Sequence, residues 1–276
     1  MFGRLILGGA QLSSTYGITN HMKKIMSMDA AASFIKIAAE KGFCAIDIAE
    51  DYGELVSKIN SINSGLEVHS KVNILEYTAL QTSLERHSKI ENLKVLYIHD
   101  ADRCNLKDVN IQASIEAFKK YCTEKKISFG LSIYDAKTLL DFIKFGITPD
   151  LVQYPKNVIS AIDPIGEICK KNNIKVTYRS LFLQGILAAD NITELPYNFR
   201  ENLVIKKFYK WADRSKMSRW QICLLDNSVK DADKVLGFAN LQQMEVILAD
   251  LDQDVSIEYP NHLKTNNQNL IDPRKW

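Results

Sequence analysis

The chain has 276 residues, of which 46% are hydrophobic and 25% are charged, the balance of an ordinary globular protein. Its 35 Lys and Arg against 33 Asp and Glu leave a net charge of +2, without the basic excess that nucleic-acid binders usually carry. No stretch approaches the roughly 18 apolar residues that a membrane span needs, and the N-terminus lacks the regions of a secretory signal. We therefore expect a cytoplasmic monomer or homodimer whose partner is a small molecule, with no nucleic-acid or membrane partner.

Sequence motifs exclude further classes of protein. Neither GxGxxG nor GxxxxGK[ST] occurs, which disfavours a Rossmann dinucleotide loop and a P-loop. The five cysteines are odd in number, widely spaced and free of CxxC pairs, so we expect reduced thiols. The histidines show no metal-ligand spacing, and no metal is expected.

Short apolar runs alternate with segments of helical periodicity along the chain. The runs predict strands at 4–9, 43–48, 66–72, 93–99, 127–132, 150–154, 174–179 and 234–238. The intervening segments predict helices at 29–41, 53–62, 76–89, 110–125, 135–145, 162–172, 200–226 and 240–250. We expect the segment 200–226 to be two helices that divide around Lys216 to Ser218, with Ser218 capping the second.

Eight strands that alternate with helices favour a parallel sheet with right-handed crossovers. Doubly wound sheets usually stop at five or six strands, whereas eight strands can close into a (β/α)₈ TIM barrel of about 250 residues. No linker rich in Pro, Gly or Ser interrupts the chain. The prediction is an α/β protein in which residues 1–276 form a single (β/α)₈ domain, with its chemistry at the C-terminal ends of the strands.

Four polar residues are expected at those strand ends. Asp47 lies near the end of the second predicted strand, Tyr52 follows in the next loop, Lys71 ends the third strand and His99 ends the fourth. Each alone could be a cap or a solvated side chain, but together they suit proton donation to a carbonyl oxygen. A phenol has a pKa near 10, which a neighbouring ammonium lowers. Asp47 would keep Lys71 charged, and His99 would align the carbonyl.

None of these four side chains can supply a hydride, so a cofactor must. The segment GFCAIDIAEDYGE, together with Lys71 and His99, resembles the aldo-keto reductase superfamily, whose members carry an Asp-Tyr-Lys-His tetrad on a (β/α)₈ barrel. The resemblance continues through LGGAQLSSTYGI, ISFGLSIY, DLVQYPKN, YRSLFLQGIL and KVLGFANLQQMEVIL. It implies an oxidoreductase in which Tyr52 is the general acid and NADPH or NADH lies across the barrel mouth. The chain also resembles compact bacterial members, which favours a sugar-derived or phosphorylated carbonyl substrate.

The resemblance also implies a cofactor site. Ser132 and Gln153 match residues that hold the nicotinamide carboxamide, but Ile133 replaces the Asn that usually follows the Ser. Arg179 falls where members commonly stack an aromatic ring on the nicotinamide, and it could stack there or contact the pyrophosphate. The other cofactor contacts that the resemblance implies are Ser180, Leu183, Gly185, Gly237, Asn240 and Gln243.

The cofactor preference depends on the end of the eighth strand. Members that prefer NADPH often place Lys or Arg there for the 2′-phosphate, whereas this chain has GFAN at 237–240. We therefore expect a weak preference for NADPH, which makes NADH plausible. Lys230, Lys234 or Arg274 could still reach in from neighbouring loops, and Asn240 could cap the last helix or contact the ribose.

Substrate contacts are expected from the loops above the tetrad. Gln11 and Tyr16 follow the first strand, Arg103 follows the fourth, Asn157 follows the sixth and Trp276 ends the chain. Arg103 could bind an anionic group, although an exposed arginine is more often simply solvated. The C-terminal LIDPRKW either folds over the site or frays.

Two other functions stay open beside the reductase. Ile133 and the missing strand-eight cations would suit a barrel that binds cofactor weakly and serves as a regulatory or binding subunit. A redox-neutral sugar-modifying enzyme, such as an epimerase or lyase, would hold the nicotinamide tightly and recycle it. The complete tetrad favours the reductase, and cofactor that survives dialysis would favour the redox-neutral enzyme.

Overall fold

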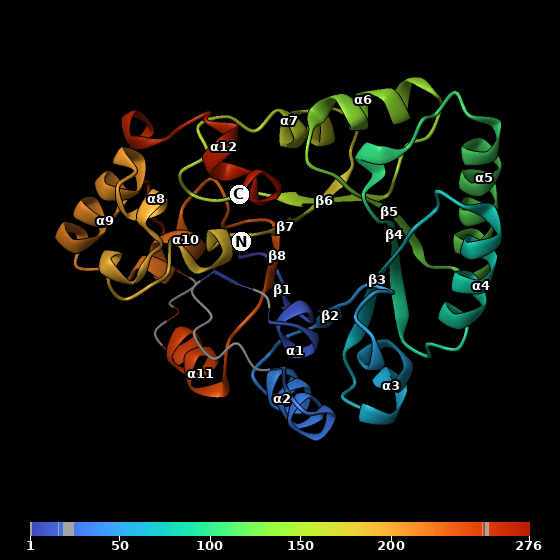
Figure 1. The fold of residues 1–276 in the computed structure, drawn as a ribbon, viewed down its shortest axis with the longest axis horizontal. Coiled ribbons are helices and arrows are strands. Elements are labelled where there is room, and N and C mark those ends of the chain that lie inside the picture. The colour runs from blue at the N-terminus through green and yellow to red at the C-terminus, as the bar shows by residue number, and fades with distance from the viewer. Residues whose placement is uncertain (1, 16, 19–24, 250, 252–253) are drawn as a thin grey trace.

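Eight parallel strands close into a barrel in which β1 is hydrogen-bonded to both β2 and β8. The strands are β1 Leu5–Gly8, β2 Ala45–Asp47, β3 Glu67–Val72, β4 Leu93–Ile98, β5 Ser128–Ser132, β6 Leu151–Pro155, β7 Lys175–Arg179 and β8 Asp233–Leu236. The structure is a computed structural model that describes residues 2–15, 17–18, 25–249, 251 and 254–276 (Figure 1). Each strand overlaps its predicted segment, and the predicted (β/α)₈ TIM barrel is confirmed.

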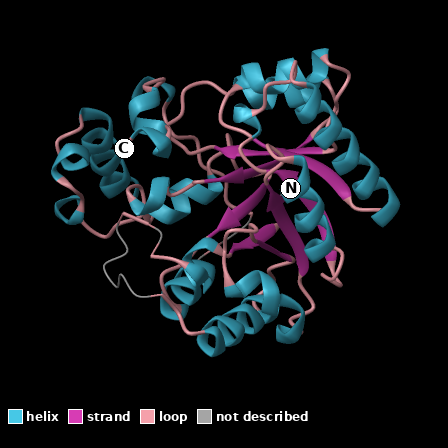
Figure 2. Cartoon of the chain, turned by 45° about the vertical axis from the view of Figure 1, so that its right-hand side comes forward, coloured by secondary structure: helices cyan, strands magenta, loops and turns pink. Residues whose placement is uncertain are grey.

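Helices surround the strands, as Figure 2 shows. The predicted helices are present as α2 Met28–Glu40, α3 Glu54–Ile62, α4 Tyr77–His87, α5 Val109–Lys125, α6 Ala136–Lys144, α7 Pro164–Lys171, α9 Leu203–Ser215, α10 Arg219–Leu225 and α11 Leu241–Ala249. Three short helices were not predicted: α1 Ala10–Ser13, α8 Tyr197–Arg200 and α12 Gln268–Ile271. No helix in the described part of the chain is long and apolar enough to cross a membrane.

The predicted division of 200–226 is confirmed in detail. The helix α9 ends at Ser215, and the next residue, Lys216, adopts a left-handed conformation with φ 60°. The Ser218 side chain then accepts a hydrogen bond from the backbone N–H of Gln221, and the Gln221 side chain accepts one from the backbone N–H of Ser218 at 2.9 Å. This reciprocal capping box satisfies donors at the start of α10 that would otherwise lack partners.

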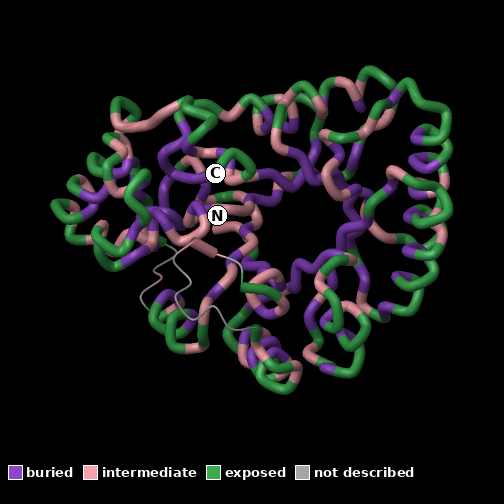
Figure 3. Tube along the Cα trace, viewed as in Figure 1, coloured by how far each residue is buried: buried purple, intermediate pink, exposed green. Residues whose placement is uncertain are grey.

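The alternation of side chains along each strand separates two environments. Outward-facing residues such as Leu7, Ile46 and Val152 pack in the hydrophobic core between the strands and the helices. Figure 3 shows the same division along the chain, with buried strands and exposed outer helix faces. Asp47 and Lys71 have the opposite orientation and are buried inside the barrel. Because side chains alternate along a strand, Asp47 and Lys71 point into the barrel interior near the C-terminal ends of β2 and β3.

Tyr97 fills the barrel interior beside this charged pair. It is fully buried, and the Nζ of Lys71 lies 5.9 Å from the centre of its ring. Its neighbour across the β4–β5 pairing is Gly130, and a Cβ at Gly130 would lie 2.4 Å from Cδ1 of Tyr97. Only glycine leaves room for the ring at this position, so Gly130 and Tyr97 together form the floor beneath the charged pair.

A second hydrophobic cluster lies beside the barrel. It contains residues of α8, α9 and α10, of the segments after β6 and β7, and of the C-terminal segment. Figure 1 shows α8, α9 and α10 together on the side of the barrel away from α4 and α5. The C-terminal segment joins this cluster through Trp276, whose ring meets Phe199 edge-on at a centroid distance of 4.8 Å. The chain end is thereby packed against α8.

Candidate active site

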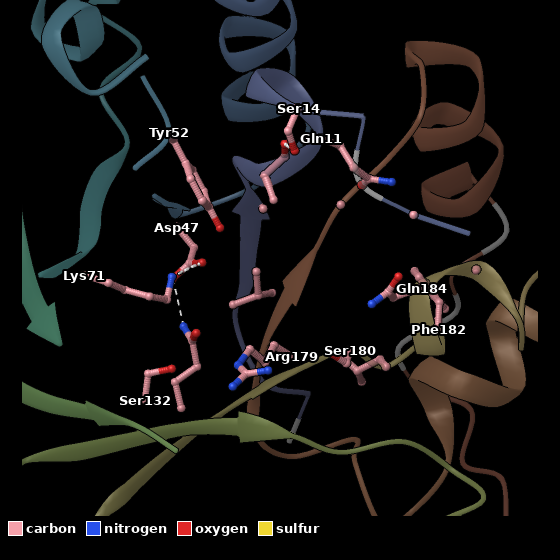
Figure 4. Close-up of a pocket in the computed structure, with 18 of the residues that line it drawn as sticks. Gln11, Ser14, Asp47, Tyr52, Lys71, Ser132, Arg179, Ser180, Phe182 and Gln184 are labelled. Atoms are coloured by element: carbon pink, nitrogen blue, oxygen red, sulfur yellow. Dashed lines mark hydrogen bonds and ion pairs between the residues drawn. The ribbon is translucent and has the colours of Figure 1, made fainter. Parts of the chain in front are cut away.

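A cavity of about 380 Å³ opens at the C-terminal ends of the strands. Its walls come from strand ends and from the loops that follow them, as expected for a barrel of this kind. Figure 4 shows Tyr52, Asp47 and Lys71 on one side of the cavity and Ser180, Phe182 and Gln184 on the other, with Arg179 between the two groups. The volume lies within the range of small-molecule sites.

Asp47 and Lys71 form a buried ion pair at the base of this cavity. The Nζ of Lys71 donates to Oδ2 of Asp47 at 2.5 Å and to the carbonyl oxygen of Ile48 at 3.3 Å. The amide Nε2 of Gln153 donates to Oδ1 of Asp47 at 2.8 Å, so both carboxylate oxygens accept a hydrogen bond. Burial lowers the pKa of Lys71 from its ordinary value, and the carboxylate of Asp47 acts in the opposite direction.

Tyr52 and His99 line the same cavity. The backbone N–H of Tyr52 donates to the carbonyl of Ala49 at 2.9 Å, which holds the tyrosine in a tight turn before α3. His99 follows β4, and its backbone N–H donates to the carbonyl of Val72 at 2.8 Å. Burial lowers the pKa of His99 and Lys71 adds to that effect, so the imidazole is neutral near pH 7. The four residues expected from the sequence thus meet in one cavity.

The residues expected at the cofactor divide into two groups. Those that line the cavity are Ser132, Gln153, Arg179, Ser180, Gly185, Gly237 and Gln243. Leu183 does not line it, because its side chain is fully buried in the cluster beside the barrel. Asn240 does not line it either, because its Oδ1 accepts the backbone N–H of Gln243 at 2.8 Å and so caps α11. Of the two roles considered for Asn240, the structure shows the helix cap.

The two amide atoms of Gln153 differ in their contacts with the described residues. While its Nε2 donates to Asp47, its Oε1 is buried and has no hydrogen-bond partner among the described residues. A buried acceptor without a partner is costly, and such groups often mark a place where a ligand or water binds. Ile133 supplies only backbone groups here: its N–H donates to the carbonyl of Gln153 at 3.0 Å. The amide oxygen of Gln153 is therefore an acceptor available within the site.

The loop after β7 contains residues in unusual backbone conformations. Ser180, Leu183 and Gln184 have φ values of 57°, 49° and 54°, the left-handed region that non-glycine residues rarely adopt. Ser180 and Gln184 line the cavity, as does Phe182 between them. Strained backbone of this kind tends to occur at functional sites. Sequence reasoning missed Phe182 and Gln184, because left-handed backbone at non-glycine residues leaves no clear sequence signal.

The residues expected at the substrate are placed less uniformly. Gln11 lines the cavity, whereas Tyr16 lies outside the described residues. Arg103 is exposed and does not reach the cavity wall. Asn157 is buried behind it, where its Oδ1 accepts from the hydroxyl of Ser160 at 3.1 Å. Trp276 also stays away from the cavity, because its ring packs against Phe199. Arg103, Asn157 and Trp276 therefore do not line the cavity to which the sequence assigned them.

The three cations considered for a 2′-phosphate are used elsewhere. The Nζ of Lys230 donates to the carbonyl of Val255 at 2.8 Å, and that of Lys234 donates to the carbonyl of Ala232 at 2.7 Å. Arg274 forms an ion pair with Asp272 at 2.8 Å. Among the described residues that line the cavity, Lys71 and Arg179 are the only Lys or Arg side chains. The described chain also contains no group of three His, Cys, Asp or Glu residues placed to hold a metal ion.

The C-terminal segment meets the cavity wall indirectly. Tyr134, which follows β5 and lines the cavity, has the Cζ of Arg179 at 4.1 Å and the Cζ of Arg274 at 3.6 Å from its ring centre. Asp102 accepts the backbone N–H of Tyr134 at 3.0 Å and lies 3.8 Å from Nη1 of Arg274. The tail therefore neither frays nor lines the cavity; it packs behind one of the lining residues.

The sequence model of the aldo/keto reductase family matches residues 4–248. Solved structures also resemble the chain along nearly its whole length. An aldo/keto reductase from Brucella melitensis is 20% identical, with a TM-score of 0.61 over 94% of this chain and 91% of that chain. An aldose reductase from Giardia lamblia is 16% identical, with a TM-score of 0.61 over 94% and 89%.

A mutant of Gox0644 in complex with NADPH is 14% identical to this chain, with a TM-score of 0.67 over 99% of this chain and 94% of that chain. At these identities the structural likeness shows a shared fold. No curated protein matches the chain significantly. The assignment of a family therefore rests on the sequence model, which spans more than half of the residues.

Proposed function

The chain belongs to the aldo/keto reductase family, a family of oxidoreductases, and we propose that it uses a nicotinamide cofactor to reduce an aldehyde or ketone to an alcohol. The observation that carries this proposal is the buried pair of Lys71 and Asp47, 2.5 Å apart, in a cavity that Tyr52 and His99 also line. Burying two charges costs desolvation free energy whatever their role. Such pairs in cavities are often functional, because they shift the pKa of neighbouring groups. Here the purpose of the pair would be to assist proton transfer.

Tyr52 is the proton donor in this proposal. A phenol is protonated at neutral pH, and its O–H bond breaks as the proton passes to the carbonyl oxygen. The phenolate that is left is stabilised by the ammonium of Lys71, whose field is weakly screened because the side chain is buried. Asp47 keeps that ammonium charged and fixes its position. Neutral His99 can donate one N–H to the carbonyl oxygen and so orient it.

The residues at the β5 to β8 strand ends fit a nicotinamide dinucleotide. The hydroxyl of Ser132 and the unpartnered Oε1 of Gln153 would hold the carboxamide. The backbone at Ser180 and Gly185 would lie against the pyrophosphate. Gly237 leaves room for the side chain of Gln11, whose Oε1 would lie 2.0 Å from a Cβ at that position. When bound, the nicotinamide supplies the hydride for the reduction.

The adenosine end of the cofactor would lie near Gln243, which lines the cavity where the 2′-phosphate cations of other members are missing. A 2′-phosphate carries close to two charges and is held by Arg or Lys when binding is strong. We therefore propose that NADH binds about as well as NADPH. The carbonyl substrate is a small molecule, and a sugar-derived aldehyde is included in the proposal.

Two measurements test the function. Calorimetric titration with NADH and with NADPH should show binding of at least one, and Tyr52→Phe should retain that binding while losing nearly all aldehyde-dependent cofactor oxidation. The matched control is Tyr197→Phe, which changes an exposed tyrosine far from the cavity. Absence of binding by both cofactors, or full turnover by Tyr52→Phe, would refute the proposal.

A further inference from the structure

Two carboxylates line the cavity beside the residues that would handle the carbonyl group. Asp51 directly precedes Tyr52 in the loop after β2, and Asp100 directly follows His99 after β4. Figure 4 shows Tyr52 across the cavity from Ser180 in the loop after β7, where the dinucleotide is proposed to lie. The two aspartates are thus next to the proton donor and the carbonyl-orienting imidazole, on the side of the cavity that the substrate would occupy.

The turn that carries Asp51 is held by its neighbour Glu50. The backbone N–H of Glu50 donates to the carbonyl of Lys71 at 3.0 Å, and its carboxylate accepts the backbone N–H of Asn73 at 2.6 Å. Asp51 itself is exposed, and within the described chain no hydrogen bond or ion pair engages its side chain. One acidic residue of this turn is therefore used to build the loop, while the next is left for the cavity.

Asp100 is held in a similar way by its backbone. It has φ 50° and ψ 47°, a left-handed conformation that aspartate tolerates better than most other residues. Its carbonyl accepts the backbone N–H of Arg103 at 2.9 Å, but its side chain does not cap the short helix that begins there. No ion pair joins Asp100 to the exposed Arg103 or to another described residue. Its carboxylate, on a partly buried residue of the cavity wall, is also unpaired.

The other charges of the cavity are balanced elsewhere. Lys71 is neutralised by its buried ion pair, and Arg179 lies at the end of β7, where the anionic pyrophosphate of a dinucleotide would offset it. Burial lowers the pKa of His99, and the carboxylates of Asp100 and Asp51 oppose that effect, as negative charges close to the imidazole should. Asp51 and Asp100 are therefore the charges that a substrate would meet among the described lining residues.

The neighbouring polar group is also a hydrogen-bond acceptor. The hydroxyl of Ser14, which Figure 4 shows beside Gln11 at the cavity, donates its proton to the carbonyl of Ala10 at 2.7 Å and keeps its oxygen lone pairs free for a ligand. A wall of carboxylate and hydroxyl oxygens accepts O–H and N–H groups. It repels a carboxylate or phosphate, an effect of about tenfold or more in affinity for a partly solvated charge pair.

We infer, on the basis of the reductase function proposed above, that the substrate is a neutral or cationic carbonyl compound with O–H or N–H donors, and that Asp51 and Asp100 exclude compounds that bear a carboxylate or phosphate. The two aspartates determine specificity and take no part in proton transfer. Of the substrates expected from the sequence, this favours a sugar-derived aldehyde over a phosphorylated one.

The test compares substrates that differ in charge but little in shape. Succinic semialdehyde is compared with its methyl ester, and betaine aldehyde with its neutral isostere 3,3-dimethylbutyraldehyde. The wild type should show kcat/KM at least about tenfold lower for the anion than for the ester, and about threefold or more higher for the cation than for its isostere. In the double variant Asp51→Asn with Asp100→Asn, both ratios should fall to within about twofold of one. Asparagine keeps the shape of the side chain and tolerates the left-handed backbone of Asp100.

Three controls show that charge is the cause. Asp51→Glu keeps the charge and should keep both ratios, whereas Asp190→Asn changes an exposed aspartate that does not line the cavity and should alter neither. Raising the salt concentration from about 0.05 to about 0.5 M should shrink both ratios in the wild type, because salt screens exposed charges. A general loss of activity cancels in these ratios. A wild type that reduces succinic semialdehyde as well as its ester, or ratios unchanged in the double variant, would overturn the inference.

A binding experiment keeps this result distinct from failure of the proposed function. Choline and 3,3-dimethyl-1-butanol, the alcohols that correspond to the cationic pair, are titrated calorimetrically into the wild type and the double variant, with NADH and without it. Tighter binding of choline by the wild type, lost in the double variant, supports the inference even if no aldehyde is reduced. Equal affinity for the two alcohols in the wild type, or loss of NADH binding in the double variant, overturns it.

Discussion

The two halves of the barrel mouth are held together by different kinds of interaction. In the half formed by β2, β3 and β4, Asp47 and Lys71 form a buried ion pair, and Gln153 reaches across from β6 to complete the coordination of Asp47. In the half formed by β5 to β8, Arg179 stacks on Tyr134 and the loop after β7 passes through left-handed turns. We call these the tetrad half and the cofactor half.

The two halves differ in how far their contacts depend on the identity of the side chains. In the tetrad half, both Asp47 and Lys71 are needed, because removing one member of a buried ion pair leaves the other charge uncompensated. In the cofactor half, many contacts use backbone groups, such as the carbonyl of Ile133, which do not depend on side-chain identity. The two departures expected from the sequence resemblance, at Ile133 and Arg179, both lie in that second half.

The largest effect is expected in the tetrad half, from Lys71→Met. Asp47 would be left buried and unpaired, so the free energy of unfolding should fall by about 3–5 kcal/mol, and reductase turnover should fall by at least about 100-fold. Urea denaturation and steady-state kinetics measure the two effects. The double variant Lys71→Met with Asp47→Asn should regain stability but not activity. A single variant as stable as wild type would contradict the distinction between the halves.

A smaller loss of stability is expected at the seam between the halves, from Gly130→Ala. The added Cβ would lie 2.4 Å from the buried ring of Tyr97, which has no space to move. Overpacking of this kind costs about 1–3 kcal/mol, and chemical denaturation measures it. Ser128→Ala in the same strand adds no atom and serves as the control. Equal stability of Gly130→Ala and wild type would show that the floor of the site is not tightly packed.

The pH dependence of stability should also come from the tetrad half. Burial lowers the pKa of His69, His87 and His99, all of which lie on β3, α4 or the end of β4. The unfolded chain therefore takes up these protons at a higher pH than the folded protein does. The contribution of these histidines to the free energy of unfolding is full above pH 6.5, the ordinary pKa of histidine. It falls as the pH drops below that value, by about 1.4 kcal/mol for each unit by which folding lowers a pKa.

Urea denaturation at pH 7.5 and 5.5 measures this dependence. His87→Gln removes one buried imidazole, which contacts Ser70 at 2.8 Å, and should make the pH dependence shallower. Greater stability at pH 5.5 than at pH 7.5 would contradict the prediction, because it would require the folded protein to bind more protons than the unfolded chain.

The smallest change in stability is expected in the cofactor half, from Gly237→Ala. Its Cβ would lie 2.0 Å from Oε1 of Gln11, the end of a flexible side chain that can rotate away. The free energy of unfolding should change by no more than about 0.5 kcal/mol, while NADH binding weakens because Gln11 is pushed into the cavity. Calorimetry measures the binding. A destabilisation as large as that of Gly130→Ala would remove the contrast between the two halves.

The sequence predicted regular elements better than loops. The strands and long helices were found because apolar periodicity marks them. Asp47, Lys71 and His99 were expected in one cavity because they lie at or just after the ends of consecutive strands, and the structure brings them together there. Arg103 and Asn157 were placed near the substrate only because they follow strands. Residues in loops have no periodicity to orient them, so Tyr134 was missed and these two were assigned to a cavity that they do not line.

The sequence by itself determined the barrel and the set of polar residues at its C-terminal end, because alternation along a strand fixes which side chains face inward. Only the tertiary structure decided which of the charges are neutralised. The sequence made both Arg179 and Arg274 candidates for contact with a cofactor phosphate. In the structure, Arg274 is paired with Asp272 and Asp102. Arg179 lines the cavity and has no carboxylate partner among the described residues. Contact between Arg179, Tyr134 and Arg274 joins segments far apart in the chain, and no local pattern encodes it.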